Sequence, residues 1–310
     1  MALAPSSHNT QPWLFRVDNT GVELYADRTR ALPVVDPEDR ALIISCGAAL
    51  YNLRVAIRHF GFTDGVELFP DGSQHDLLAR VSIGVPRHPT ADDDQRFSAI
   101  PLRRSNRQPF DSRPVAQMLI DRLVAAASEE SDWLAVVSGG EIRNAVADLV
   151  AEGDRTQAAS KPFRRELAAW MHHNRSRSRD GMPGYAHGMG ELTSLLGPFL
   201  IRTFDWGSGQ AAKDRQLTVG SPVLAVLGTT SDDPQAWLAA GQALSSFLLL
   251  ARAEGVYNSY LNQPIEVPEL RPRLRDLIGQ SGFPQILVRL GYGPDTRPTP
   301  RRTVSEVVLS

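Results

Sequence analysis

The chain has 310 residues, of which 42% are hydrophobic and 22% charged, and its formal net charge at pH 7 is −2. These proportions are those of a globular protein, which argues against general disorder, and the length allows one large domain or two small ones. The small net charge gives no reason to expect nucleic acid or an anionic membrane as a partner.

The only cysteine is Cys46, so neither an intramolecular disulfide nor an all-cysteine metal site is available. Because Cys46 lies in the apolar run 43–53, we expect a small buried side chain rather than a reactive thiol. The chain start shows no basic region followed by an apolar stretch, and the longest apolar candidate, residues 243–253, includes two serines and an arginine. We therefore expect a cytoplasmic protein without a membrane span.

The first motif is the sequence Ala-Pro-Ser-Ser-His-Asn-Thr-Gln-Pro-Trp at positions 4–13. It predicts a turn with accessible backbone, because a proline fixes φ and small hydroxyl residues let the main chain approach a planar ligand. The side-chain amides of Asn9 and Gln11 are available as donors. An ordinary turn is the alternative.

Two predicted helices, residues 48–60 and 242–254, are each bracketed by glycines at the same spacing, and the segment Ser45 to Leu50 is taken as the start of the first helix. A glycine just past a helix ends it without steric cost, and a glycine near its start allows close packing. Two such helices can also arise by chance.

Extended segments with alternating apolar residues follow each helix, at 66–69 and 78–83 in the first case and at 284–290 in the second. The period of two predicts strands. The repeated order favours an internal duplication, with α+β halves at residues 1–97 and 98–310.

The second motif places three arginines and a serine within five positions, at Arg103, Arg104, Ser105 and Arg107. Guanidinium groups satisfy the oxygens of a phosphate monoester with charge-assisted hydrogen bonds of roughly 1.5–3 kcal/mol each. A solvated basic loop is the alternative. Together, the turn and this loop suggest one site for a flavin phosphate.

The middle region, residues 152–216, is the least regular part of the sequence, and such an insertion is often a lid or binding loop. It contains the adjacent pair His172 and His173. The pair lacks the helical spacing of metal ligands, and no partner completes a coordination set, so we expect solvated histidines and no metal site.

The turn, the arginine loop, the segment Ser45 to Leu50 and the carboxy-terminal run Pro300 to Arg302 together resemble the nitroreductase superfamily of FMN-binding flavoproteins. Within it the chain is similar to the Acg-type branch, whose members carry two nitroreductase-like halves in one chain. The resemblance implies an α+β nitroreductase-like fold, in which two fused halves form an internal pseudo-dimer with mostly antiparallel sheets and surrounding helices. It also implies a first helix ahead of the turn, which this sequence does not show.

In ordinary nitroreductases, two identical chains share two FMN sites, each built from the turn of one subunit and the arginine loop of the other. Here the first half has only the turn and the second only the loop. The resemblance therefore implies one FMN per chain and a monomeric pseudo-dimer, with higher assembly left open. In the Acg-type branch, the segment that corresponds to the middle region folds over the flavin.

The resemblance also assigns roles to residues. Arg103, Ser105 and Arg107 would meet the phosphate, the ribityl chain and the pyrimidine edge, and the turn would line the opposite face. Residues 261–263 would offer a backbone N–H to flavin N5, with Asn262 in place of a more frequent acidic residue. Arg301 would return to the phosphate. The implied cofactor-binding residues are Pro5, Ser6, Ser7, Asn9, Arg103, Arg104, Ser105, Arg107, Leu261, Asn262, Gln263, Arg301 and Arg302.

Two functions follow from this resemblance. One is an FMN-dependent oxidoreductase that takes a hydride from NADPH or NADH as a transient donor and passes electrons to a nitroaromatic, a quinone or a similar acceptor. The other is an FMN-sequestering protein with a closed lid and little turnover. No Gly-rich segment has the context of a Rossmann fingerprint, so a tightly held second dinucleotide is not indicated.

Overall fold

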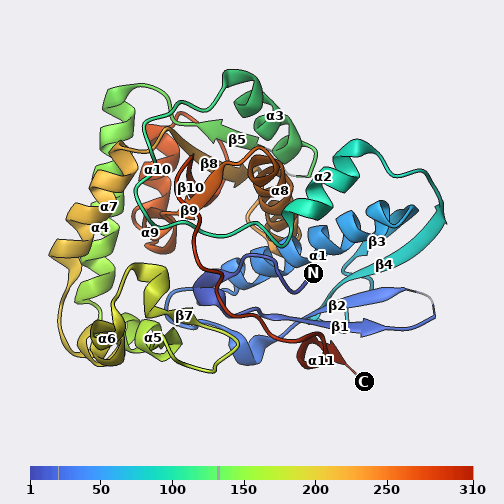
Figure 1. Ribbon diagram of the computed structural model, residues 1–310, viewed down its shortest axis with the longest axis horizontal. Coiled ribbons are helices and arrows are strands. Elements are labelled where there is room, and N and C mark those ends of the chain that lie inside the picture. Colours follow the sequence, from blue (N-terminus) through green and yellow to red (C-terminus); the bar gives the residue numbers. More distant parts are fainter. Residues whose placement is uncertain (20, 131–132, 310) are drawn as a thin grey trace.

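The computed structural model describes residues 1–19, 21–130 and 133–309. Helices and strands are interspersed along the described chain, often in consecutive pairs (Figure 1). In chain order they are β1 (Trp13–Val17), β2 (Val22–Ala26), α1 (Arg40–His59), β3 (Phe62–Leu68), β4 (Leu77–Pro86), α2 (Ala91–Ala99), α3 (Gln117–Ser128), β5 (Trp133–Val136), α4 (Gly140–Ala159), α5 (Lys161–Trp170), β6 (Met171–His172), β7 (Met182–Pro183), α6 (Glu191–Thr203), α7 (Gly207–Val219), β8 (Val223–Thr229), α8 (Pro234–Ala253), β9 (Tyr257–Tyr260), α9 (Gln263–Glu266), α10 (Arg271–Leu277), β10 (Phe283–Gly291), α11 (Val304–Val307) and β11 (Val308–Leu309).

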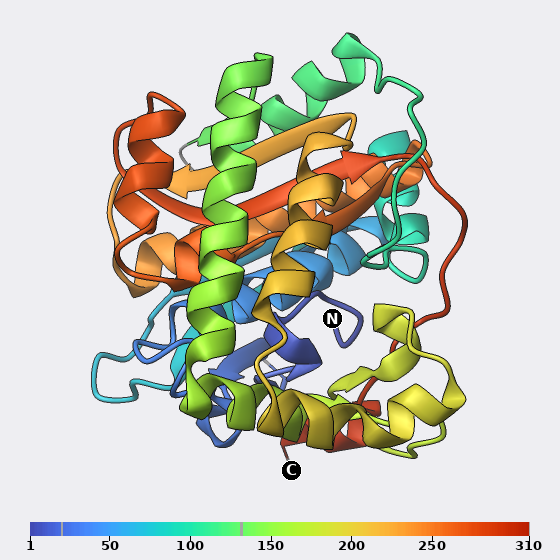
Figure 2. The ribbon, with the colours of Figure 1, turned by 90° about the vertical axis from the view of Figure 1, so that its left-hand side faces the viewer.

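Two separate sheets enclose a helical layer. The five-stranded sheet has the order β11-β1-β2-β4-β3, and the four-stranded sheet has the order β5-β8-β10-β9. Every pairing in these sheets is antiparallel except that of β1 with β11. The helices α1 and α8 lie between the sheets, while α4 and α7 run side by side across the outer face of the four-stranded sheet (Figure 2). The expected α+β fold with mostly antiparallel sheets is confirmed.

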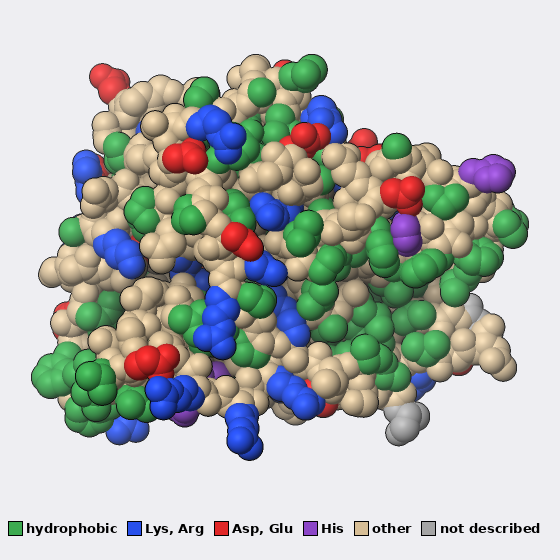
Figure 3. Space-filling model, in the orientation of Figure 1, with side chains coloured by type: hydrophobic (Ala, Val, Ile, Leu, Met, Phe, Trp, Pro, Cys, Tyr) green, Lys and Arg blue, Asp and Glu red, His purple; other side chains and the backbone are tan. Residues whose placement is uncertain are grey.

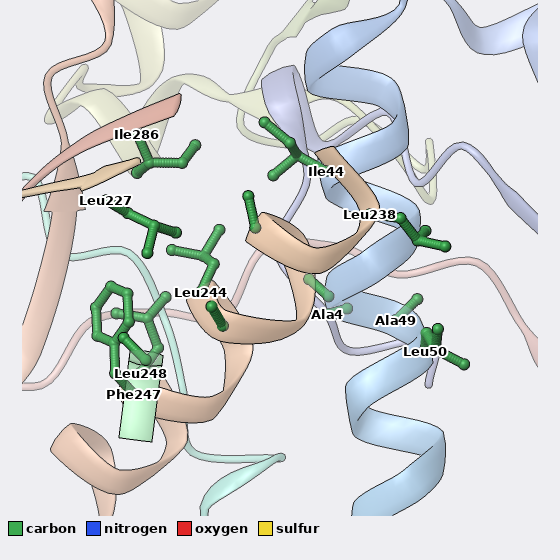
Figure 4. Close-up of a cluster of buried hydrophobic side chains, with 14 of the residues drawn as sticks. Ala4, Ile44, Ala49, Leu50, Leu227, Leu238, Leu244, Phe247, Leu248 and Ile286 are labelled. Atoms are coloured by element: carbon green, nitrogen blue, oxygen red, sulfur yellow. The ribbon is translucent and has the colours of Figure 1, made fainter. Parts of the chain in front are cut away.

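The main core lies where α1 and α8 meet the inner faces of both sheets. Figure 4 shows Leu244 and Phe247 of α8 beside Leu227 of β8, with Leu50 on α1 across the layer. Strand β8 is buried along its whole length because both its faces are covered. Its alternate residues face this core and a second core under α4 and α10. Strands sandwiched in this way read as continuous apolar runs.

The helices α1 and α8 cross at two glycines, Gly47 and Gly241. A Cβ on Gly241 would lie 2.0 Å from the carbonyl oxygen of Ile44, and a Cβ on Gly47 would lie 2.2 Å from that of Leu238. Each glycine thus allows the backbone of the partner helix to approach, as a small residue at a packing site does. The expected strands and the helix-ending glycines Gly61 and Gly255, with φ of +84° and +78°, are confirmed.

The expected helix starts were wrong, because both helices begin about two turns earlier and the two glycines lie well inside them. The segment Ser45 to Leu50 is therefore mid-helix. Helix α1 is capped from a distance by Asp36, whose carboxylate accepts from the N–H groups of Ala41 and Leu42 at 3.0 and 2.9 Å. Helix α8 has Asp233 as its N-cap and Pro234 in its first turn, a regular start signal.

The expectation of an irregular middle region was also wrong over most of residues 152–216, where α4, α5, α6 and α7 account for most of the chain. Helix α7 escapes a pattern search because its buried residues include Gly207 and Asp214 as well as Leu217, so no apolar stripe marks its inner face. Between α5 and α6, residues 171–190 form only short elements, and we call this stretch the cap segment.

Helices α1 and α8 are long and apolar enough to cross a membrane by length and composition alone, but 78% of the relevant window of each is buried inside the structure. Such burial is usual for core helices. Cys46 is fully buried on α1, as expected, and its Sγ lies 3.1 Å from the carbonyl oxygen of Pro12. Burial raises the pKa of the Cys46 thiol, which agrees with an unreactive side chain.

Candidate functional site

The turn after Pro5 has an unusual backbone. His8, Asn9 and Gln11 have φ of 49°, 56° and 53°, a left-handed conformation that non-glycine residues rarely adopt. The hydroxyl of Ser6 accepts from the N–H of Gln11 at 3.0 Å. Strained residues of this kind persist only where surrounding contacts hold them, and they cluster at functional sites.

Two side-chain amides hold the turn in place. Asn9 Nδ2 donates to the carbonyl oxygens of Gly181 and Pro300 at 2.8 and 3.0 Å. Gln11 Nε2 donates to the carbonyl oxygen of Arg179 at 2.9 Å, and its Oε1 accepts from the N–H of Arg302 at 2.8 Å. The amides therefore bind the cap segment and residues 292–303, which we call the C-terminal segment. They are not free donors for a ligand.

Arg103 lies inside the protein with most of its hydrogen-bonding capacity unused. Arg103 is only 5% exposed. Among the described residues its side chain makes one hydrogen bond, from Nη2 to the carbonyl oxygen of Leu3 at 3.3 Å. Its Nε and Nη1 are buried without a partner there, as are Arg301 Nε and Tyr260 Oη. Unsatisfied buried donors of this kind are costly, and a ligand or a water molecule that accepts from them removes that cost.

These groups lie within electrostatic reach of one another. Burial, and then the charge of Arg103, lowers the pKa of Arg301 to about 9, and burial lowers that of Arg103. Burial raises the pKa of the Tyr260 phenol, an effect that Arg103, Arg107 and Arg301 oppose. Among the described residues, neither Arg103 nor Arg301 forms an ion pair with a carboxylate. This Arg103–Arg301 cluster is therefore a buried cationic site suited to an anion.

Arg107 extends the cationic site toward two histidines. Burial, followed by the charge of Arg107, lowers the pKa of His8 to about 4 and that of His187 well below its usual value. Both imidazoles are therefore neutral at pH 7. His187 belongs to the cap segment, where its Nε2 is buried without a partner among the described residues. Arg107 Nη2 lies 3.8 Å from Met182 Sδ of the same segment.

The rest of the arginine loop is fastened to the four-stranded sheet. Ser105 forms a bridge with Asn258 of β9. Arg289 on β10, 1% exposed, donates from Nη2 to the carbonyl oxygens of Asn106 and Gln108 at 3.1 and 3.0 Å. Arg104 turns the other way, toward the carboxylate of Asp295 at 3.3 Å and the carbonyl oxygen of Thr296 at 2.7 Å. The loop thus separates an inward Arg103 from an outward Arg104.

Residues 261–263 continue from β9 beside the buried cluster. The N–H of Leu261 donates to the carbonyl oxygen of Leu287 at 2.9 Å, and Asn262 Oδ1 accepts from the N–H of Leu287 at 2.9 Å. The side chain of Asn262 thereby holds the end of β9 against β10. Gln263 reaches away to α4 and α7, where its Nε2 donates to Asp154 and Asp214.

The two C-terminal arginines have different surroundings. Arg301 Nη1 donates to Asn9 Oδ1 at 2.5 Å and leaves its Nε unused. Arg302 donates to the carbonyl oxygen of Gln11 at 3.0 Å and lies 3.4 Å from the carboxylate of Asp27. Arg302 therefore fastens the turn, while Arg301 reaches the cluster. Pro5 is buried in the turn, and Ser6 and Ser7 are half-buried beside it.

The cap segment completes the site by lying against the turn. The N–H of Gly181 donates to the carbonyl oxygen of Asn9 at 3.2 Å, Asp180 pairs with Arg30, and the hydroxyl of Tyr185 donates to the carbonyl oxygen of Pro298 at 2.8 Å. His172 is half-buried, 3.5 Å from Asp180, so the expectation of a solvated pair holds only for the exposed His173. Nowhere in the described parts do three or more His, Cys, Asp or Glu residues lie together as a metal site.

Sequence reasoning named the turn, the arginine loop and Arg301, and the structure brings these together across the molecule. On the face shown in Figure 3, Lys and Arg side chains gather over the middle, where the C-terminal segment runs. Tyr260, His8, His187 and Arg289 were missed. Arg289 had a usable signal, since it is the one charge inside an apolar strand; the others had none.

No family model matches the chain. The chain is 34% identical over 311 residues to a Mycobacterium tuberculosis protein provisionally named as an NAD(P)H nitroreductase, covering 98% of this chain and 88% of the relative. A second protein of that organism, provisionally named the NAD(P)H nitroreductase Acg, is 29% identical, with 98% and 91% covered. The NAD(P)H nitroreductase PigM of a Serratia strain, also a provisional name, is 24% identical, with 99% and 90% covered.

Among solved structures, the FMN and NADPH-dependent nitroreductase NfnB of a Sphigopyxis strain has a TM-score of 0.46 at 21% identity, with 69% of this chain and 98% of that chain covered. The NfnB of Mycobacterium smegmatis in complex with NADPH has a TM-score of 0.43 at 19% identity, with 69% and 96% covered. An identity of 34% over 98% of the chain is decisive by itself. The chain belongs to the NAD(P)H nitroreductase family.

Proposed function

We propose that this protein is an FMN-dependent oxidoreductase that takes reducing equivalents from NADPH or NADH and delivers them to a small acceptor such as a nitroaromatic or a quinone. The observation that carries the proposal is the buried Arg103–Arg301 cluster, in which Arg103 Nε, Arg103 Nη1 and Arg301 Nε have no partner among the described residues. The choice of NADPH or NADH as the electron donor is supported by the relatives, which are provisionally named NAD(P)H nitroreductases.

The cluster fits the phosphate of FMN. Two buried cations that repel each other are stabilised by a group with nearly two negative charges, and the phosphate oxygens accept the hydrogen bonds that Arg103 Nε and Nη1 and Arg301 Nε leave unmade. Tyr260 Oη is a further donor at the same place.

The neighbouring residues fit the flavin ring. Arg107 would place a positive charge beside the pyrimidine edge, and the imidazoles of His8 and His187, neutral at pH 7, would add no further positive charge there. The main-chain N–H of Leu261 already donates to Leu287, so within residues 261–263 the N–H groups of Asn262 and Gln263 would be the ones offered toward N5, with the Asn262 side chain held by β10. The bound flavin itself would supply the hydride chemistry, while the protein sets its orientation and electrostatics.

We further propose that the chain is an internal pseudo-dimer of two halves, residues 1–97 and 98–310, acting in the cytoplasm. The mutual contact of Gly47 and Gly241 at the crossing of α1 and α8 supports a two-fold relation, because equivalent positions meet at such an axis. The C-terminal strand β11 crosses back to pair with β1, which would carry Arg301 from the second half to the turn of the first.

One FMN per chain is the expected stoichiometry. The described residues contain one turn and one arginine loop, and these meet at one cluster. Flavin released from purified protein by denaturation, measured by absorbance against protein concentration, should give a ratio near one. A ratio near two would contradict the single composite site, and a ratio near zero after reconstitution would contradict the flavin assignment.

Sequestration of FMN with little turnover is the second candidate, because the cap segment is hydrogen-bonded both to the turn and to Pro298 near the C-terminus. The variant Asp180→Asn with Tyr185→Phe removes the ion pair to Arg30 and the hydrogen bond to Pro298 but leaves the cluster intact. If the cap limits access, this variant should keep its flavin and be reduced faster by NADPH or NADH, as measured by stopped-flow absorbance.

The matched control is Arg175→Gln, which breaks an exposed ion pair to Glu191 at the outer side of the cap segment and should leave the rate unchanged. Fast reduction of the unmodified protein by either nucleotide supports the enzyme. Reduction by dithionite alone, in both the unmodified protein and the loosened variant, would support storage and contradict the proposed oxidoreductase.

A further inference from the structure

Two buried carboxyl groups meet at one amide beside the proposed site. Gln263 Nε2 donates to Asp154 Oδ1 of α4 at 3.0 Å and to Asp214 Oδ2 of α7 at 3.1 Å. Asp154 is 3% exposed and Asp214 is 8% exposed. Neither carboxyl forms an ion pair with Lys or Arg in the described parts of the chain, and Asp154 Oδ2 is left without a hydrogen-bond partner there. Figure 2 shows α4 and α7, the helices that carry the two carboxyls, side by side.

A single neutral amide cannot compensate two negative charges in a dry interior. Burial, followed by the charge of Asp214, raises the pKa of Asp154 to about 8, and burial raises that of Asp214. The two groups titrate as one system, as neighbouring carboxyls do. With its pKa at about 8, Asp154 is protonated at pH 7, and its unpartnered Oδ2 is free to carry the proton.

The groups packed around the pair differ in sign. On α9, the half-buried Glu266 accepts from Gln157 and adds negative potential at Asp154. On α7, Lys213 lowers the pKa of Asp214, as do hydrogen bonds from Gln210 and Gln263. Arg289 of β10 acts in the same direction.

Arg107 is the link to the proposed site, because the charge of Asp214 acts on its guanidinium. Electrostatic interactions are mutual, so the state of Arg107 also acts on Asp214. The amide that joins the carboxyls belongs to Gln263, the last residue of the segment 261–263. Through this amide the pair is joined to the site from the side of α4 and α7.

We infer that Asp154 and Asp214 share one proton and form the proton-holding group of this site, taking up a further proton from water when negative charge enters beside Arg107. The inference rests on the proposed function. A negative charge at Arg107 cancels part of the positive potential that favours ionised Asp214, so the proton affinity of the pair rises. When the product leaves with the electrons, the potential returns and the proton is released toward the site. Asp154 and Asp214 would act on the site indirectly, through the amide of Gln263 and the charge of Arg107.

The proton itself is tested by infrared spectroscopy of the full protein in D2O. At pH 7 we expect the carbonyl stretch of a protonated carboxyl group that weakens as pH rises through about 8, the pKa of Asp154, and that is absent from Asp154→Asn. The control Glu152→Gln alters an exposed carboxylate on the same helix, paired with Arg273, and should retain the band. Absence of a protonated carboxyl in the unmodified protein at pH 7 would overturn the inference, whether or not the variants fold.

The coupling is tested by the pH dependence of the midpoint potential of the flavin-loaded protein, titrated with dithionite. Around the pKa of the pair, two-electron reduction of the unmodified protein should take up more protons than reduction of Asp154→Asn or Asp214→Asn, so its potential should fall more steeply with pH. Equal slopes in all three proteins would overturn the inference while leaving the oxidoreductase intact. Failure of the proposed function is seen separately, as protein that binds no FMN.

Discussion

Replacement of Arg103 by alanine is expected to weaken FMN binding by about ten- to a hundredfold, because it removes charge-assisted hydrogen bonds worth roughly 1.5–3 kcal/mol from the phosphate. Riboflavin lacks the phosphate and should lose much less affinity. Titration of each ligand into apoprotein, monitored through the quenching of flavin fluorescence, measures the loss of affinity for FMN and for riboflavin.

The neighbouring Arg104→Ala is the matched control, since Arg104 directs its guanidinium to Asp295 and Thr296 rather than into the cluster. We expect a smaller loss of FMN affinity from it than from Arg103→Ala. If Arg103→Ala weakened FMN and riboflavin equally, Arg103 would act through folding, and the assignment of the cluster to the phosphate would be wrong.

Replacement of Gly241 by alanine is expected to lower the free energy of unfolding by about 3 kcal/mol or more, at the upper end for overpacking. The added Cβ would lie 2.0 Å from the carbonyl oxygen of Ile44 and 2.8 Å from the Cα of Gly47. Both contacts are backbone atoms of α1, so no side chain can move aside. The two central helices would have to separate, and the core shared with both sheets would loosen.

Gly209→Ala is the control for helix propensity, because Gly209 is exposed on α7 and its added Cβ would meet nothing within 4 Å. We expect this variant to be more stable than the unmodified protein by roughly 0.5–1 kcal/mol, because alanine loses less conformational entropy than glycine when a helix forms. Urea unfolding at 25 °C, monitored by circular dichroism, gives both values. A Gly241→Ala protein as stable as the unmodified one would show that the helix crossing is less tight than the contacts indicate.

Some elements could be read from local sequence because their signals are local. Gly61 and Gly255 end their helices through a positive φ that glycine adopts without strain, and alternating apolar residues indicated β3, β4 and β10. The starts of α1 and α8 were misread, since apolar periodicity does not distinguish a glycine at a helix start from one inside it. Helix α7 was missed because it buries Asp214 among small residues instead of an apolar stripe.

The same division applies to the candidate site. The sequence alone determined which segments carry its chemistry, since a turn of proline, serine and amide residues and a loop of three arginines are patterns within a few positions. It also determined the family through identity along nearly the whole chain.

Only the tertiary structure decided which of these side chains remain free for a ligand. Asn9 and Arg302 donate hydrogen bonds to carbonyl groups of distant segments, and Arg104 donates to the carbonyl oxygen of Thr296. Arg103 and Arg301 are buried with nitrogens that have no partner among the described residues. The carboxyl pair on α4 and α7 likewise exists only because Gln263 brings its two members together. Whether a polar group is satisfied depends on partners far away in the chain, and local sequence contains no record of them.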